Sequence, residues 1–241
     1  MSDPTSSKGD AMTTSGEVAC CELSASMEDY LKAMLHLDAE GEAVTTTALA
    51  HRVEVAPPSA SAMLRRLREA GLVQAGEGHE LELTTHGRGH ALRVVRRHRL
   101  VETFLAEVLD VPWDEVHDEA ERLEHSLSPA LEERIAVRLG DPSHDPHGDP
   151  IPPRDGEHDE AWPDPLDAVP AGAGFLVERV SDRDSDVLRY LDELGVRPGV
   201  TLQVGERDPF GGPLWIEVGG QRRALGLPLA RLVHGSVISE S

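Results

Sequence analysis

The sequence predicts a mainly α-helical protein that ends in a small β-barrel. Three observations lead to this fold class. Apolar residues recur at helical spacing through most of residues 24–140, a proline-rich acidic stretch covers 141–170, and short alternating strands follow from about residue 174. With 241 residues and 39% hydrophobic content, the chain can hold one large domain or two to three small domains with packed cores.

Residues 24–88 are predicted to form a winged helix-turn-helix. A first helix fits 27–40, a second fits 46–53, and a third, with two prolines at its start, fits 57–70. Two short strands then flank the Gly-rich turn at 76–78. Three short helices followed by a hairpin are typical of this fold, which binds DNA by placing its last helix in the major groove.

Residues 89–140 are predicted to form a helical dimerisation domain. One long helical pattern runs from Thr85 to about Leu109, a second helix fits 114–127, and a third begins at Ser128-Pro129. These helices carry more apolar residues than so small a unit can bury, which favours a dimer interface. The second helix is predicted to bury Val116, Ala120, Leu123 and Leu127, and the third helix carries Leu131, Ile135 and Leu139 on one face.

The remaining segments are a tail, a linker and the barrel. Residues 1–23 are rich in Ser, Asp and Thr without an apolar signal-peptide core, so we predict a disordered tail in a cytoplasmic protein without a membrane span. Residues 141–170 hold eight of the 17 prolines and nine acids against one arginine, which predicts an acidic linker. Strand patterns in 171–241 predict the barrel, with a short helix near 186–194.

The charge is strongly acidic but unevenly distributed. The net charge is −21, and Lys8 and Lys32 are the only lysines. Dense carboxylates with almost no lysine favour a protein that is soluble in concentrated salt, and the alternative is simply an acidic protein. Residues 51–99, in contrast, hold nine arginines against five glutamates, a local charge of +4. A basic region in an acidic chain indicates a surface that faces a polyanion.

Six residues on two consecutive helices have the spacing and chemistry of metal ligands. Two of them lie four residues apart on the long helix, and four lie on one face of the next helix: His98 and Glu102, then His117, Glu121, Glu124 and His125. Carboxylates and imidazoles without a thiolate suit Mn²⁺ or Fe²⁺ better than Cu⁺ or a structural zinc. The alternative is a solvated acidic face with histidines placed by chance, and six residues in phase favour the metal site over it.

Residues 24–140 resemble the diphtheria toxin repressor family, which includes iron-dependent regulators and manganese transport regulators. The stretches that carry the resemblance are Met27-Glu28-Asp29-Tyr30-Leu31, Arg97-His98-Arg99-Leu100, Val116-His117-Asp118-Glu119-Ala120 and Glu124-His125. The stretch 146–152 is similar to the segment that closes the family's dimerisation domain, and the C-terminal part is similar, more weakly, to its SH3-like domain. The resemblance implies a homodimeric repressor of metal homeostasis genes that binds operator DNA when it holds metal.

The resemblance implies a primary metal site formed by Asp29, Glu121, Glu124 and His125. Iron-type members have Met and Cys where this chain has Asp29 and Glu121, whereas oxygen ligands there are similar to the manganese-type members. Those members build a second metal position with a Glu where this chain has Lys32, so their two-metal arrangement is in question here. A competing explanation makes Asp29 part of a capping box that begins at Ser26.

The resemblance also implies an ancillary site like that of the iron-type members. The predicted ligands are His98, Glu102, His117 and, from the SH3-like domain, Asp184, whereas Val187 stands at a ligand position and cannot ligate. Three histidines of the predicted linker, at positions 144, 147 and 158, are interpreted as incidental.

The third helix of the winged helix is the expected DNA contact. Pro58, Ser59 and Ser61 match family positions that approach DNA, and Arg65 and Arg66 follow along the same helix. The alternative is that these arginines only solvate the helix. At ~1 M salt the Debye length is about 3 Å, so affinity would depend on close contacts and on ordering by the metal.

The favoured function is a repressor activated by Mn²⁺, and the first alternative is an Fe²⁺-dependent regulator of iron uptake genes. A metal-carboxylate enzyme would need paired Glu-x-x-His ligands from several helices, which this chain lacks. A metal-independent DNA-binding protein with a partner-binding barrel would leave the phased ligands unexplained. We therefore expect no enzymatic activity and no small-molecule substrate.

Overall fold

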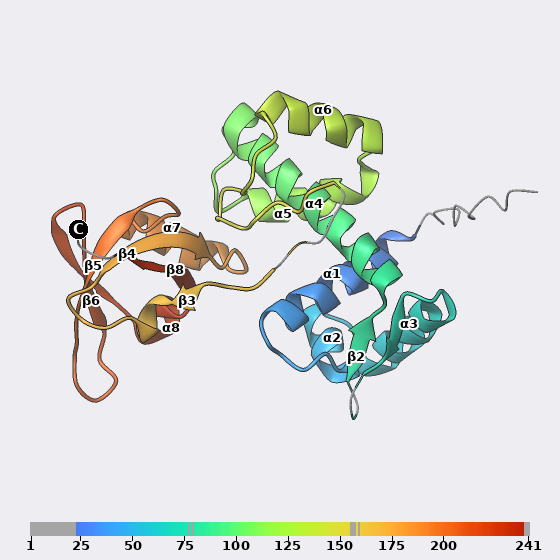
Figure 1. The fold of residues 1–241 in the computed structure, drawn as a ribbon, viewed down its shortest axis with the longest axis horizontal. Helices are drawn as coiled ribbons and strands as arrows, with labels where there is room; N and C mark the ends of the chain where they lie inside the picture. The colour runs from blue at the N-terminus through green and yellow to red at the C-terminus, as the bar shows by residue number, and fades with distance from the viewer. Residues whose placement is uncertain (1–22, 77, 79, 155–157, 159, 239–241) are drawn as a thin grey trace, which may run out of the picture.

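The computed structural model describes residues 23–76, 78, 80–154, 158 and 160–238. The predicted tail therefore lies outside the described residues except for Leu23. Figure 1 shows three parts: an N-terminal part in blue and teal, a helical part in green, and a C-terminal β part in orange and red. The long helix α4 (Thr85–Leu109) starts in the N-terminal part and continues into the helical part (Figure 1). None of the described helices is both long and apolar enough to span a membrane.

The N-terminal part has the predicted winged helix-turn-helix. Its helices are α1 (Ala25–Ala39), α2 (Thr46–Arg52) and α3 (Pro57–Glu69), and its wing is the antiparallel pair of β1 (Val73–Ala75) and β2 (Leu81–Leu83). Fully buried leucines form its core, because the helices turn one apolar face inward. These leucines include Leu31, Leu35, Leu49 and Leu67.

The capping-box explanation for Asp29 is wrong. Helix α1 begins at Ala25 with Ser24 at the N-cap position, so Ser26 lies inside the helix rather than before it. A capping box needs its serine at the N-cap and its acid three residues later. The carboxylate of Asp29 is therefore available for another role.

The helical part contains α4, α5 (Val116–Leu123), the 3-10 turn η1 (Glu124–Ser126) and α6 (Pro129–Leu139). The predicted helix over 114–127 thus tightens at Glu124. Leu123, which was predicted to face inward, is 43% exposed, and Leu131 is 47% exposed. The next residue, Glu124, is fully buried, so at this point a carboxylate and not Leu123 faces the interior. Part of the predicted apolar face therefore lies at the surface of the single chain.

The C-terminal part is an antiparallel sheet with short helices. Its strands are β3 (Asp164–Pro165), β4 (Gly174–Val180), β5 (Thr201–Arg207), β6 (Leu214–Val218), β7 (Gln221–Leu225) and β8 (Val233–Ile238), and its helices are η2 (Leu166–Ala168), α7 (Ser185–Leu194) and α8 (Leu227–Ala230). The order is β3-β8-β4-β5-β6-β7. In the described residues β3 and β7 remain edges, so the sheet does not close into the predicted barrel. Strand β3 has only two residues and extends the sheet little.

The predicted linker packs against the other parts over much of its described length. Asp145, His147, Asp149 and Ile151 are buried. Gly148 makes this packing possible, since its φ is +86° and a Cβ atom would lie 1.9 Å from the carbonyl oxygen of Glu178. The segment therefore brings polar side chains into the interior instead of only connecting two domains.

Candidate metal centre

A cavity of about 960 Å³ lies where the three parts meet, and five of the eight predicted metal ligands line it. Most lining residues come from α1, α2, α4, α5, the 141–154 segment and the loop after β4. They include Asp29, Lys32, His98, Glu102, His117, Glu121, Asp145 and Asp182. A cavity lined by carboxylates and imidazoles from separate elements has the donor set that Mn²⁺ or Fe²⁺ needs.

Asp29, Glu124 and His125 form the first group of possible ligands, with their ligand atoms within 4.8 Å of one another. The Nε2 atom of His125 lies 2.8 Å from Oδ1 of Asp29 and 3.3 Å from Oε1 of Glu124. Asp29 belongs to α1 and the other two belong to η1, so the group joins the winged helix to the helical part. These are three of the four predicted primary ligands.

The orientation of His125 is fixed by a residue that sequence reasoning missed. Its Nδ1 atom lies 2.8 Å from Oε2 of Glu28, and this contact leaves Nε2 facing Asp29. A histidine that donates one ring N–H to a carboxylate presents its other nitrogen to a metal. The only sequence signal was that Glu28 precedes Asp29 in the stretch that carries the family resemblance.

In both carboxylates of this group, burial raises the pKa and nearby positive groups lower it, but the net results differ. Burial raises the pKa of Asp29 above its ordinary value, although His125 and Lys32 oppose it. Burial also disfavours the Glu124 carboxylate, but a hydrogen bond from His98 and the charge of Lys32 lower the pKa of Glu124 to about 2. Glu124 is therefore ionised at neutral pH.

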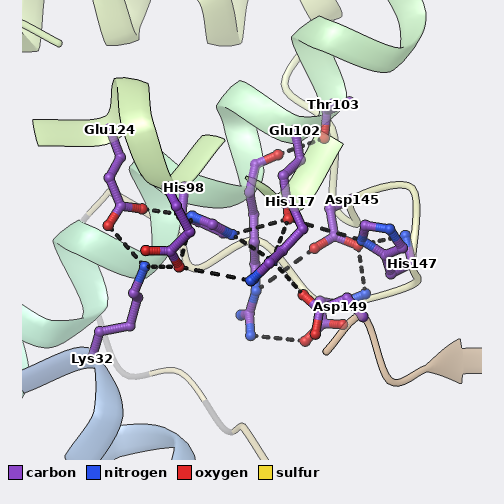
Figure 2. A network of polar contacts seen from close by, with 12 residues as sticks. Lys32, His98, Glu102, Thr103, His117, Glu124, Asp145, His147 and Asp149 are labelled. Atoms are coloured by element: carbon purple, nitrogen blue, oxygen red, sulfur yellow. Dashed lines mark hydrogen bonds and ion pairs between the residues drawn. The ribbon is translucent and has the colours of Figure 1, made fainter. Parts of the chain in front are cut away.

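Glu121, the fourth predicted primary ligand, lies in an adjoining group with His98 and Glu124. The ammonium of Lys32 contacts this group, with Nζ 2.6 Å from Oε1 of Glu121 and 2.8 Å from Oε1 of Glu124. Figure 2 shows Lys32 extending from α1 toward Glu124. Burial alone would lower the pKa of Lys32, but Glu124 and Glu121 raise it above its ordinary value.

The ancillary group contains His98, Glu102 and His117, as predicted, together with Asp182. Oε1 of Glu102 lies 2.9 Å from Nε2 of His98 and 3.1 Å from Nδ1 of His117, and Oδ2 of Asp182 lies 3.0 Å from the same nitrogen of His117. Burial disfavours both imidazolium ions, but Glu102 raises the pKa of His98 to about 9, and Asp182 with Glu102 raises the pKa of His117 to about 11.

The predicted ligand Asp184 has a different role from the one expected. It is the N-cap of α7, and its Oδ1 atom accepts hydrogen bonds from the backbone N–H groups of Asp186 and Val187. Asp182, two residues earlier, supplies the carboxylate of the C-terminal part instead. An aspartate directly before a helix is a common N-cap, and this signal could have identified Asp184 as the cap.

A third group consists of the buried residues Glu102, Asp145 and His147. Within the described part of the chain, Oε2 of Glu102, Oδ2 of Asp145 and Nδ1 of His147 are buried without a hydrogen-bond partner. The Nε2 atom of His147 lies 2.7 Å from the carbonyl oxygen of Trp113, to which it donates (Figure 2 labels His147). In a neutral imidazole, Nδ1 then keeps a lone pair for a cation.

This third group fits a cation, because polar atoms buried without partners are costly. Burial and the nearby Asp149 carboxylate raise the pKa of Asp145 well above its ordinary value, which reflects the cost of crowded acids. His147 therefore differs from the incidental linker histidine that was expected. His144, in contrast, is exposed beside Ser143, and His158 lies 2.9 Å from Glu160 outside these groups.

The residues predicted to contact DNA share one exposed region of the winged helix. All five lie on α3 with exposed side chains: Pro58, Ser59, Ser61, Arg65 and Arg66. The hydroxyl of Ser61 donates to the carbonyl of Pro57, and Arg65 lies 4.0 Å from Glu69. The surface of α3 is therefore open to a partner.

Three family models match the chain in order. The iron dependent repressor N-terminal DNA binding domain matches residues 22–78. The iron dependent repressor metal binding and dimerisation domain matches residues 84–153, and the FeoA domain matches residues 165–236. The three matches follow the three parts of the fold.

Individual proteins match over most of the chain. The iron-dependent repressor IdeR of Mycobacterium leprae is 35% identical over 222 residues, which are 86% of this chain and 94% of that protein. The diphtheria toxin repressor of Corynebacterium diphtheriae is 31% identical over 191 residues, or 75% and 84%. A solved manganese-dependent transcriptional repressor in complex with manganese is 40% identical, with a TM-score of 0.82 over 88% of this chain and 100% of that chain.

Proposed function

The chain belongs to the diphtheria toxin repressor family of iron-dependent repressors, and we propose from this premise that it is a metal-dependent, homodimeric repressor of metal homeostasis genes. Mn²⁺ is the favoured activating ion and Fe²⁺ is the alternative. The members that the chain matches are repressors rather than enzymes, and the proposal includes no catalytic step. A repressor that binds operator DNA acts in the cytoplasm.

One observation carries the proposal: Asp29 of the winged helix meets Glu124 and His125 of the helical part. A divalent ion at this point would neutralise the two carboxylates and so favour the arrangement in which α1 and η1 lie together. Asp29, Glu124 and His125 fix the winged helix relative to the helical part, and Glu28 orients His125. A coupling of about 1–3 kcal/mol, or roughly 5–150-fold in DNA affinity, is typical of such switches.

The ligand chemistry supports Mn²⁺. The first group offers two carboxylates and one imidazole, and the only cysteines of the sequence lie outside the described residues. Hard oxygen donors favour Mn²⁺, whereas sulfur donors favour softer ions. The similar solved repressor is manganese-dependent, which also favours this ion.

A second ion would connect the C-terminal part to the helical part. Its proposed ligands are Glu102, His117 and Asp182, with His98, Asp145 and His147 close by. The buried polar atoms without partners in the described residues support this second position. The proposed role of the C-terminal part is thus to complete the ancillary site through Asp182.

Dimerisation and DNA binding use separate surfaces in this proposal. Apolar side chains exposed on the helical part, among them Leu123, Leu131 and Val137, would pack against a second copy. The exposed surface of α3 would then enter the major groove once in each half-site.

A DNA-binding assay tests the proposed switch. In a gel shift in KCl with operator DNA, Mn²⁺ should raise the affinity of the wild-type dimer, and Asp29→Asn should remove most of this increase while the protein stays folded. Asp38→Asn, at an exposed position on the same helix, is the matched control and should respond like wild type. Equal wild-type affinity with and without Mn²⁺ would refute the switch. An anaerobic Fe²⁺ titration in the same assay compares the two ions.

A further inference from the structure

Two possible cation positions share the carboxylate of Glu124. The first is formed with Asp29 and His125, and the second is formed with His98 and Glu121. The ammonium of Lys32 lies within hydrogen-bond distance of two of the three residues of the second position, Glu121 and Glu124, whereas in the first position it contacts Glu124 alone. The two positions therefore differ in how far the ammonium of Lys32 compensates their negative charge.

Lys32 is buried and held in place by two carboxylates. The residue is only 7% exposed, and Glu124 is fully buried. An ammonium buried at such a place is tolerated only if partners compensate its lost hydration, and the two carboxylates at 2.6 and 2.8 Å do so. Lys32 lies one helical turn after Asp29 on α1, so the same helix presents a ligand to one position and a cation to the next.

A divalent ion cannot share the second position with this ammonium. An ion bound by both Glu121 and Glu124 would lie within a few ångströms of Nζ, where repulsion between like charges is strong in a poorly hydrated interior. The other oxygen of Glu124, Oε2, is also engaged, because Nδ1 of His98 lies 2.6 Å from it. The second position is thus compensated by groups that belong to the chain itself.

We propose that Lys32 is the permanent cation of the second position, so that the primary centre holds one divalent ion at Asp29, Glu124 and His125 and no second ion beside it. This inference rests on the proposed function, because it assumes that the first position binds the activating ion. It assigns to Lys32 the role of setting the number of ions at the centre.

The test counts the ions and asks whether two of them are adjacent. Full-length wild type, Lys32→Glu, Lys32→Gln and the control Arg122→Glu are dialysed against MnCl₂, and bound Mn²⁺ is measured by elemental analysis and by EPR. Arg122 is exposed on α5 and pairs with Glu119, so its substitution repeats the change in charge outside the centre. Near-UV circular dichroism checks the folding of each protein.

The expected result is that Lys32→Glu binds one more Mn²⁺ per chain than wild type and shows the EPR signal of a spin-coupled pair. Lys32→Gln, which removes the charge without adding one, should also gain an ion, but with lower affinity. If the new carboxylate beside Asp29, Glu121 and Glu124 prevents Lys32→Glu from folding, Lys32→Gln still tests the inference. Arg122→Glu should match wild type in both measurements.

Two results would overturn the inference: a coupled pair in wild type, which would mean that Mn²⁺ displaces Lys32, or no added ion in either folded variant. Failure of the proposed function would be recognised separately. In that case Asp29→Asn would bind as much Mn²⁺ as wild type.

Discussion

The two aspartates after β4 show how much a shift of two residues changes a side chain's role. Asp182 lies 3.0 Å from His117, and burial opposes its ionisation, but His117 holds the pKa of Asp182 well below its ordinary value. Asp184 instead caps α7 through two backbone N–H groups. The first aspartate joins two domains, and the second stabilises a helix end.

Substitution of each aspartate should therefore give a different result. Asp182→Asn should lower the Mn²⁺ content by up to one ion per chain, because the ancillary group loses the carboxylate that the C-terminal part supplies to it. Asp184→Ala should leave the Mn²⁺ content unchanged and cost about 1 kcal/mol of unfolding free energy through the lost cap. Metal analysis and urea unfolding measure the two effects. Loss of metal in Asp184→Ala alone would reverse the assignment.

At the scale of elements, α4 organises the interior. Three of its residues within five positions face different partners: His98 contacts Glu124, Arg99 contacts Asp149 and Glu160, and Glu102 contacts His117. One helix thus meets α5, η1 and the segment that leads to the C-terminal part. Because consecutive turns of a helix keep their spacing, α4 fixes the distances between these contacts.

These ion pairs predict that the metal-free protein loses stability as the pH rises. The folded pKa of His98 is about 9 and that of His117 is about 11, both above the ordinary value of 6.5. Their contribution is complete below a pH of about 6.5 and declines as the pH rises through the folded pKa values, since the unfolded chain then binds fewer protons. Urea unfolding in EDTA across this range measures the decline.

The control for the pH prediction is His98→Gln, which cannot titrate at this position and should show a shallower decline above neutral pH. Mn²⁺ should also bind more tightly as the pH rises, because protons compete with the ion for the imidazoles. An unfolding free energy that rises from neutral to alkaline pH in wild type would contradict the prediction.

At the scale of the whole molecule, a buried network attaches the C-terminal part to α4. Both N–H₂ groups of Arg99 donate to Glu160 at 2.7 Å, and one of them also donates to Asp149 at 3.0 Å. Arg179 of β4 contacts Asp149 as well and lies over the ring of Trp162. The helical and C-terminal parts therefore meet through charged groups that compensate one another inside the protein.

The surface charge predicts that salt stabilises the fold. With a net charge of −21, repulsion between carboxylates opposes the compact state, and added KCl screens it. The melting temperature should rise as KCl increases from about 0.1 M to about 1 M, where the Debye length falls from ~10 Å to ~3 Å. Calorimetry measures this rise. Near pH 4.8, the isoelectric point, it should largely disappear, and an unchanged rise there would point to another cause.

The elements, and most members of the first and ancillary groups, could be predicted from the sequence alone. Helix α4 has the predicted bounds, Thr85–Leu109, and the winged helix has the predicted order of helices and strands. Asp29, Glu124 and His125 meet, and so do His98, Glu102 and His117. These features are predictable because helical periodicity and capping depend on neighbouring residues, and because ligands in phase on one helix remain on one face after folding.

Which distant residues complete these groups depends on the tertiary structure. It selected Asp182 over Asp184, brought His147 of the predicted linker beside Glu102, and left the sheet open at β3 and β7 in the described residues. The contact between Lys32 and Glu124 joins residues 92 positions apart. Periodicity carries no information over such a distance, because the packing of whole elements sets where their side chains meet.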